Sequence, residues 1–258
     1  MTLSTDVLAC ARIVESADPH RFRAAMVAPL AARTVLFPLY AFNVEVSRAP
    51  WVTQEPMIAE MRLQWWRDVA DEIGQGGPVR RHEVATPLAE VIAPDRAHLL
   101  DALVAARSWD IHRDPFEDHD HLATYIDATA GNLVWAAASA LGPADEHTVR
   151  DAACAAGIAA WLCAVAELEA RGRIPLVDGT PEGVRRLARS ALDRLARARR
   201  NRGTVSRAAR PALNSVAGTT RILRAAARDP ARVADGRLTS DAALAGFSLA
   251  LRTATGLW

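Results

Sequence analysis

Residues 39–74 read LYAFNVEVSRAPWVTQEPMIAEMRLQWWRDVADEIG, and the spacing of their apolar side chains predicts two helices joined by a short turn. Pro50 ends a helix that begins before it, whereas Pro56 suits the first position of a new one. We therefore expect helices over 39–49 and 56–73.

The second of these helices has one apolar stripe, made by Ile58, Trp65, Trp66, Val69 and Ile73. Arg62 falls at the centre of this stripe, one helical turn from its neighbours. A guanidinium aimed at a core requires a partner anion, because a buried charge is costly unless it is paired. Two alternatives stay open for Arg62: a structural arginine that is ion-paired or snorkels to water, and an arginine that contacts a ligand.

The rest of the chain repeats the helical spacing, and no segment shows sustained alternation of apolar and polar residues, so the fold class is all-α. The breaks between helices are short, so we expect one domain over residues 1–258. Ser240 suits the N-cap of the last helix. The further helices are expected over 95–110, 121–141, 145–170, 182–200, 210–228 and 241–256.

The composition excludes several kinds of chemistry. The formal net charge is +1, which gives no global field for nucleic acid, and every basic residue is arginine, so lysine Schiff-base and P-loop chemistry are excluded. The alanine- and arginine-rich composition is typical of a bacterial coding sequence. Cys10, Cys154 and Cys163 lack metal or disulfide spacing, which favours a reducing compartment.

The sequence also indicates where the protein works. The first residues resemble neither a signal nor a transit peptide, and the uncharged run 152–166 is shorter than the roughly 20 residues of a membrane span. We expect a cytoplasmic protein, at most peripheral at the inner membrane face.

Three stretches, taken in order, resemble the squalene/phytoene synthase family. They are residues 39–74, YIDATAGNLVWAAASALG at 125–142 and GIAAWLCAVAELEARGRIPL at 157–176. The resemblance implies an isoprenoid-synthase-like helical bundle around a central cavity. In active members two aspartate motifs face each other across this cavity and hold Mg²⁺ against substrate diphosphates, since Mg²⁺ requires hard oxygen ligands.

The aspartate motifs of the family have no counterpart at the matching positions of this sequence. The first motif falls on Ser47, Arg48 and Trp51, where Arg48 reverses the expected charge and Glu45 is expected to form an ion pair with it. The second falls on Trp161, Ala164, Glu167 and Leu168. We therefore expect no metal cofactor, with Mg²⁺ as the alternative if the protein is an active prenyltransferase.

The pairing of AFNVE with MRLQWW resembles the branch of the family that lacks aspartate motifs and includes the mitochondrial respiratory complex I assembly factor. That resemblance implies a non-catalytic protein that binds an isoprenoid or other lipid, or a respiratory-complex subunit. The alternative is a head-to-head prenyl diphosphate transferase, for which the only helical candidates to replace the two aspartate motifs are Asp68, Asp71, Glu72, Glu167 and Glu169. The candidate cavity or ligand-binding residues are Tyr40, Asn43, Glu45, Arg62, Gln64, Trp65, Trp66, Tyr125 and Gly131.

Four other signals favour structural interpretations. His and acidic residues gather at 112–122, where helix capping is favoured over a metal site. The acids at 68–72 suit a solvated, salt-bridged face, and Asp127 suits an exposed first turn. The arginine-rich helix 182–200 suits a bundle surface, with peripheral contact to anionic lipid as the alternative; it lacks the interleaved aromatics of an RNA-binding surface.

Overall fold

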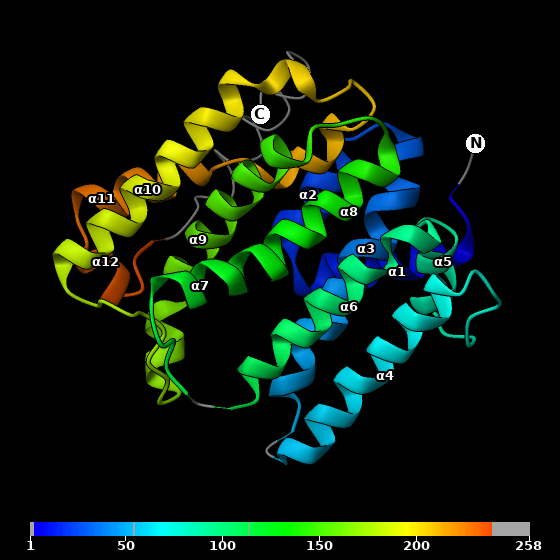
Figure 1. Ribbon diagram of the computed structural model, residues 1–258, viewed down its shortest axis with the longest axis horizontal. Helices are drawn as coiled ribbons and strands as arrows, with labels where there is room; N and C mark the ends of the chain where they lie inside the picture. Colours follow the sequence, from blue (N-terminus) through cyan, green and yellow to red (C-terminus); the bar gives the residue numbers. More distant parts are fainter. Residues whose placement is uncertain (1–2, 54, 113, 239–258) are drawn as a thin grey trace.

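The computed structural model describes residues 3–53, 55–112 and 114–238, and within these ranges the chain is helical without a β-strand (Figure 1). This confirms the all-α prediction. The α-helices are α1 (Thr5–Ala17), α2 (Pro19–Met26), α3 (Leu30–Arg48), α4 (Pro56–Gly74), α5 (Ala85–Ala89), α6 (Ala97–Ala106), α7 (His119–Ile126), α8 (Asn132–Leu141), α9 (Glu146–Ala170), α10 (Pro181–Arg200), α11 (Thr219–Arg228) and α12 (Ala231–Ala234).

Two long helices form the centre of the bundle. Helix α3 packs against α1, α2, α5 and α8, and its residues 36–44 are all buried. Helix α9 packs against α8, α10, α11 and α12. By length and composition α9 could cross a membrane, but half of its most apolar window is buried inside the bundle. Its apolar character therefore serves the core of this fold.

Side-chain caps explain where several helices begin. The Asp118 carboxylate accepts a hydrogen bond from the His121 amide at 2.8 Å, and Asp145 accepts one from the Thr148 amide at 2.8 Å. Thr180 caps α10 through the Gly183 amide at 3.1 Å. Such caps satisfy amide groups that have no partner inside the helix. The loop at 112–122 therefore caps a helix through Asp118, as the favoured interpretation predicts.

Two predicted helices are interrupted. The helix expected over 121–141 contains one π-helical turn, Asp127–Gly131, between α7 and α8. The helix expected over 210–228 is wrong as a single element, because a 3₁₀ segment over Arg210–Val216 ends before α11 and Gly218 between them has φ 85°. Only glycine adopts that backbone conformation readily, so the chain turns there. The expected helix over 241–256, with Ser240 as its cap, lies outside the described residues.

The predicted stripe of α4 is wrong at its N-terminal end. Its buried face consists of Ala59, Leu63, Trp66, Val69, Ala70 and Ile73. Ile58 and Arg62 are exposed instead, so Arg62 does not point into the core. The pattern misled because α4 carries apolar residues on two adjoining faces, of which only one is packed in the bundle.

Helix α10 lies on the bundle surface, in contact with α9 and α11 (Figure 1). Val184, Ala188, Ala191, Leu195 and Ala198 are its main buried apolar residues. Its arginines are partly tied to the bundle, since Asp151 of α9 accepts bonds from Arg194 at 3.2 Å and from Arg197 at 2.6 Å. The predicted surface helix is therefore confirmed.

Candidate functional site

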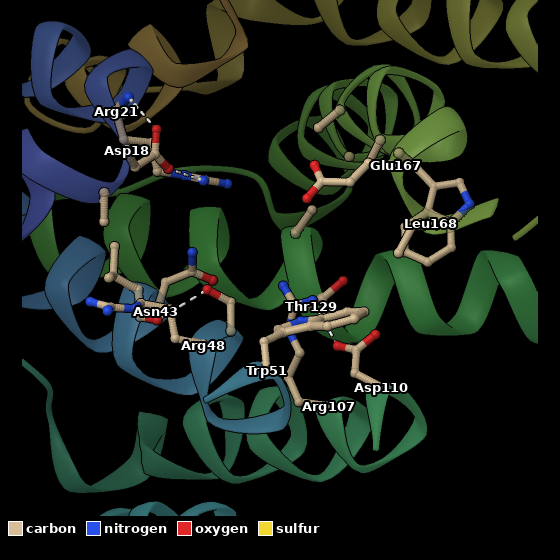
Figure 2. A pocket seen from close by; sticks show the side chains of 18 of the residues that line it. Asp18, Arg21, Asn43, Arg48, Trp51, Arg107, Asp110, Thr129, Glu167 and Leu168 are labelled. Carbon is tan, nitrogen blue, oxygen red and sulfur yellow. Dashed lines mark hydrogen bonds and ion pairs between the residues drawn. The ribbon is translucent and has the colours of Figure 1, made fainter. Parts of the chain in front are cut away.

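A cavity of about 690 Å³ opens between the C-terminal halves of α3 and α9 (Figure 2). Its other walls come from the α1–α2 junction, the end of α6, and the π-helical turn after α7. Small-molecule pockets in proteins have volumes of about 300–1,000 Å³, so this cavity is large enough for a ligand.

The apolar part of the lining combines large and small side chains. The large ones are Val44, Trp51, Ile126, Trp161 and Leu168. Small residues of α9 leave the space between them, and a Cβ added to Gly157 would lie 2.8 Å from the Ala130 Cβ. The close approach of α9 to the π-helical turn therefore depends on glycine at this position.

Asp18 and Arg21 form an ion pair at the α1–α2 end of the cavity. The Arg21 Nη1 atom lies 2.5 Å from the Asp18 carboxylate, which also caps α2 by accepting from the Arg21 amide at 2.9 Å. Burial raises the pKa of Asp18, but the charge and hydrogen bonds of Arg21 outweigh burial and lower it overall. The carboxylate is therefore held ionised by its own neighbour.

Arg107, Asp110 and Tyr125 form a buried network on the opposite wall. Arg107 donates to Asp110 at 3.1 Å and to the Tyr125 hydroxyl at 2.8 Å, and Tyr125 donates to Asp110 at 3.0 Å. Desolvation raises the pKa of the Tyr125 phenol, so it stays protonated as a donor. Asp110 is 3% exposed, and both of its carboxylate oxygens are engaged within this network.

Glu167 and Arg171 form a third pair at the end of α9. Arg171 donates to the Glu167 carboxylate at 2.5 Å, and its guanidinium carbon also lies 4.9 Å from the centre of the Trp51 ring. Arg173 approaches the same ring at 4.7 Å. Cation–π contacts therefore join the turn after α3 to the end of α9 beside the cavity.

Arg48 is different from the other charged residues of the lining. Within the described ranges, each of the three acidic residues of the lining is bonded to an arginine, and Arg48 is the one lining arginine whose side chain makes no hydrogen bond or ion pair. The predicted ion pair between Glu45 and Arg48 is wrong, since the described residues show no such pair, and Glu45 lines a separate pocket. Four arginines and three carboxylates leave the lining with a formal charge of +1.

The cavity is lined by both sets of positions that match the two aspartate motifs of the family. Ser47, Arg48 and Trp51 line it from the end of α3 and the following turn, and Trp161, Ala164, Glu167 and Leu168 line it from α9 (Figure 2). Asn43 and Tyr125, predicted as cavity residues, also line it. The sequence pattern therefore located the two facing walls.

Other predicted site residues lie elsewhere. Tyr40 is fully buried next to Arg21, whose guanidinium carbon lies 5.9 Å from the ring centre, and burial raises the Tyr40 pKa to about 12. Gln64 is exposed and donates to Asp68 at 2.7 Å. Gly131 is buried in the π-helical turn and lines neither pocket.

The remaining predicted site residues line a second pocket of about 310 Å³. It is lined by Glu45 of α3, Ala49 of the 3₁₀ turn that follows α3, Arg62, Trp65 and Trp66 of α4, and His82. These residues thus share a surface that is separate from the cavity between α3 and α9.

Asp68 and Glu72, two of the acids considered as alternative metal ligands, are engaged in surface contacts. Arg80 binds Glu72 at 2.5 Å and lies 3.8 Å from Asp68. Asp127 lies in the first turn of the π-helical segment with its side chain 43% exposed, as predicted, and it pairs with Arg150 at 3.0 Å. Throughout the part of the chain that the structure describes, no three His, Cys, Asp or Glu side chains gather as a metal site would require.

Sequence reasoning missed the pairs at Asp18 and Asp110. Asp18 precedes Pro19, which signals a helix cap but gives no sign of a cavity. Asp110 meets Tyr125 only because the 3₁₀ turn after α6 and helix α7 come together in space. No motif spacing encodes such a meeting.

Comparisons with known proteins agree with this geometry. The family model for squalene/phytoene synthase matches residues 14–176. A complex I assembly factor 6 homolog from Drosophila melanogaster is 30% identical over 181 residues, covering 65% of this chain and 53% of that protein. The chain thus spans about half the length of the curated relatives it matches.

Two solved structures share the fold. A dehydrosqualene synthase in complex with ligand superposes with a TM-score of 0.75 at 15% identity, covering 97% of this chain and 96% of that one. Squalene synthase HpnC from Alicyclobacillus acidocaldarius has a TM-score of 0.71 at 19% identity, covering 86% and 93%. The all-α isoprenoid synthase fold is thereby confirmed, and the chain belongs to the squalene/phytoene synthase family.

Proposed function

We propose that this protein is a non-catalytic member of its family that binds an amphipathic lipid with an anionic head in the cavity between α3 and α9, and that it acts in the assembly of respiratory complex I. The observation that carries the proposal is the pairing of every carboxylate of the cavity with an arginine, while Arg48 has no partner among the described residues.

Magnesium does not fit this set of donors. A divalent cation held against a diphosphate needs several carboxylate oxygens free to coordinate it. The oxygens of Asp18 and Asp110 are occupied by arginine and tyrosine donors, and Glu167 is the only acid at the positions of the two family motifs. An arginine at position 48 would also repel the metal.

An anionic head fits the same lining directly. The guanidinium of Arg48 can donate two parallel hydrogen bonds to a phosphate or carboxylate, and such charge-assisted bonds are stronger than neutral ones. Ser47 also lines the cavity near this end of α3, as does Asn43 (Figure 2). The apolar and small side chains of α9 would then contact the hydrocarbon part of the ligand.

The assembly role rests on relatives. The curated relatives that the chain matches are named complex I assembly factor 6 or its homolog. A binding protein without turnover is consistent with that name. We extend the role to this chain as a factor that works with a respiratory-complex subunit.

Contact with the inner membrane face is part of the proposal. Residues 182–237 contain fifteen arginines and four acidic residues, a formal charge of +11. Arg189 of α10 and Arg224 and Arg228 of α11 are exposed on adjacent helices. Each arginine near an anionic membrane contributes about 1 kcal/mol to binding.

Sedimentation should therefore find the protein on vesicles with anionic lipid but not on neutral vesicles. Equal binding to both kinds of vesicle would refute the contact.

Mass spectrometry of the purified protein and a binding titration test the ligand proposal. With EDTA present, farnesyl monophosphate should bind and farnesol, which has the same chain and no charge, should bind much more weakly. Because hydrogen bonds to charged groups contribute about 1.5–3 kcal/mol, Arg48→Gln should weaken monophosphate binding at least about tenfold.

Arg62→Gln is the matched control, since Arg62 is also an exposed arginine without an ion pair among the described residues but lines the other pocket. It should leave this binding unchanged. Binding that requires Mg²⁺ and is abolished by EDTA would contradict the proposal and favour a prenyl diphosphate transferase.

A further inference from the structure

Large apolar side chains are exposed along one side of α4 and in the turn that precedes it. Met57 is 71% exposed, Met61 66%, Val52 46% and Ile58 45%. A contiguous exposed apolar patch on a soluble protein commonly marks an interaction site, whereas single exposed apolar residues do not.

Helical geometry places these side chains on a face of their own. At about 100° per residue, Met57, Ile58, Met61, Arg62 and Trp65 fall within an arc of about 140°, turned by about 110° from the centre of the buried face. We call these five residues the α4 docking face. It extends about 12 Å along the helix, which matches two turns of a partner helix.

A pocket lies at one end of the α4 docking face. Arg62 and Trp65 line it together with Trp66, His82 and Glu45. Its aromatic walls are held in place by edge-to-face packing of Trp65 on Trp66 at 4.8 Å and of Trp66 on His82 at 5.5 Å. A preformed aromatic pocket beside an apolar stripe is suited to one large side chain of a partner.

The α4 docking face carries one charged side chain, Arg62, which has no counter-ion among the described residues. Arg67 and Arg80, which are its neighbours, bind Asp101 at 2.7 Å and Glu72 at 2.5 Å. The side chain of Arg62 makes no hydrogen bond or ion pair with any other described residue, and Glu45 in the same pocket is not within ion-pair distance of it. A cation set among Ile58, Met61 and Trp65 is therefore available to an incoming carboxylate.

From this complementarity we propose that the α4 docking face binds an amphipathic helix of a partner protein whose apolar stripe carries one acidic side chain opposite Arg62. Helix-in-groove recognition uses apolar anchors spaced along one face, and a carboxylate bonded to Arg62 would fix the register. Methionine, tryptophan and arginine are also the residues enriched in protein interfaces. The proposal identifies the chemistry of a partner for the proposed assembly role, and it relies on that role only for the existence of such a partner.

A membrane is the less favoured occupant of this face. Glu45 of α3 lies in the pocket and Glu60 lies on α4 itself, and both would be repelled by anionic lipid. The arginine-rich helices α10 and α11 lie on the opposite side of the molecule from α4 (Figure 1). A protein bound to a membrane through α10 and α11 would leave α4 free for a protein partner.

Site-specific photo-cross-linking in cells tests the proposal. Benzoylphenylalanine replaces Met61 in one variant and the exposed Ala196 of α10 in the control. We expect the Met61 variant to cross-link one partner protein at a helical segment where an acidic residue interrupts an apolar stripe, and the Ala196 variant not to capture it. Adding Arg62→Glu should lower the yield at least tenfold, and replacing the acidic residue of the partner by arginine should restore it.

Several results would overturn the docking face: a cross-link to phospholipid or to a second copy of this chain, no cross-link at all, or a yield that is indifferent to Arg62→Glu. The Arg62→Glu protein should keep its melting temperature, because position 62 is exposed. It should also keep farnesyl monophosphate binding in the cavity. Failure of the docking face can thus be distinguished from failure of the proposed lipid site.

Discussion

At the scale of single residues, each carboxylate that lines the cavity is stabilised by an arginine that pairs with it. Asp110 illustrates this best, because it is 3% exposed and bonds both Arg107 and Tyr125. A carboxylate in such a place is tolerated only with partners, and its removal leaves a buried arginine without a counter-ion.

Replacing Asp110 with alanine should therefore lower the free energy of unfolding by about 3–5 kcal/mol, as measured by urea denaturation. The matched control is Asp101→Ala, which removes the partner of Arg67 at a pair whose side chains are 43% and 41% exposed. That change should cost about 0–1 kcal/mol. Equal costs at the two positions would show that the Arg107 network is not a buried ion pair.

The pairing of Asp18 predicts a dependence of stability on pH. Burial raises its pKa, but Arg21 lowers it by more, so the folded-state pKa lies below the ordinary value of 3.8. A carboxyl with a lowered folded-state pKa stabilises the fold above its unfolded pKa, and this contribution disappears as the pH falls through the folded pKa.

Asp18→Asn should isolate this charge, because asparagine is also a good N-cap and keeps the start of α2. The difference in unfolding free energy between wild type and the variant should be constant above about pH 5 and should shrink as the pH falls below roughly 4. Urea denaturation at a series of pH values measures this difference. A difference that persisted unchanged to pH 2 would indicate that the charge of Asp18 does not contribute.

At the scale of elements, one wall of the cavity is formed where α9 approaches the π-helical turn very closely. A Cβ at position 157 would lie 2.8 Å from Ala130 Cβ, which is fixed to the backbone, and 2.8 Å from Ile126 Cγ2. π-Helical turns are frequent at functional sites, and this one supplies Thr129 and Ala130 to the cavity wall.

Gly157→Ala should therefore destabilise the protein by about 1–3 kcal/mol, the usual cost of overpacking. Gly179→Ala is the control, since a Cβ there meets nothing within 4 Å and its φ is not positive. Thermal unfolding of both variants measures the effect. If the two melting temperatures were the same, the contact between α9 and the π-helical turn would be looser than the structure indicates.

The same scale shows how far sequence periodicity predicts this fold. The expected ends of α4, α9 and α10 are confirmed to within a residue or two, because proline and side-chain caps mark where these helices begin. The break at Gly218 was missed, since apolar residues continue through the 3₁₀ segment. Arg62 was assigned to the core because a helix with two adjoining apolar faces has the pattern of one broad stripe.

At the scale of the whole molecule, the distribution of charge matters more than its sum. The net charge of +1 conceals a segment of +11 over residues 182–237. Because α10 and α11 lie on one side and α4 on the other, the arginine-rich surface and the exposed apolar surface are separated (Figure 1). Such a separation suits a factor that is held at a membrane on one side and meets a protein on the other.

The candidate site was only partly predictable. The facing walls follow from the family resemblance, because both walls carry recognisable helices. The arginine partners of the cavity acids do not follow from it. Arg21 and Arg107 meet their carboxylates through local turns, whereas Tyr125 joins Asp110 across the fold. Sequence reasoning could therefore expect the loss of metal ligands but not the pairing of the acids that remain.

Pyrophosphate release from farnesyl diphosphate, measured with and without Mg²⁺ on the purified protein, tests the central claim most directly. Since the cavity carboxylates are paired with arginines, pyrophosphate release should stay at the level of heat-inactivated protein at every Mg²⁺ concentration. Mg²⁺-dependent release accompanied by a condensed prenyl product would contradict the claim, because the cavity would then assemble a metal site from groups assigned here to ion pairs.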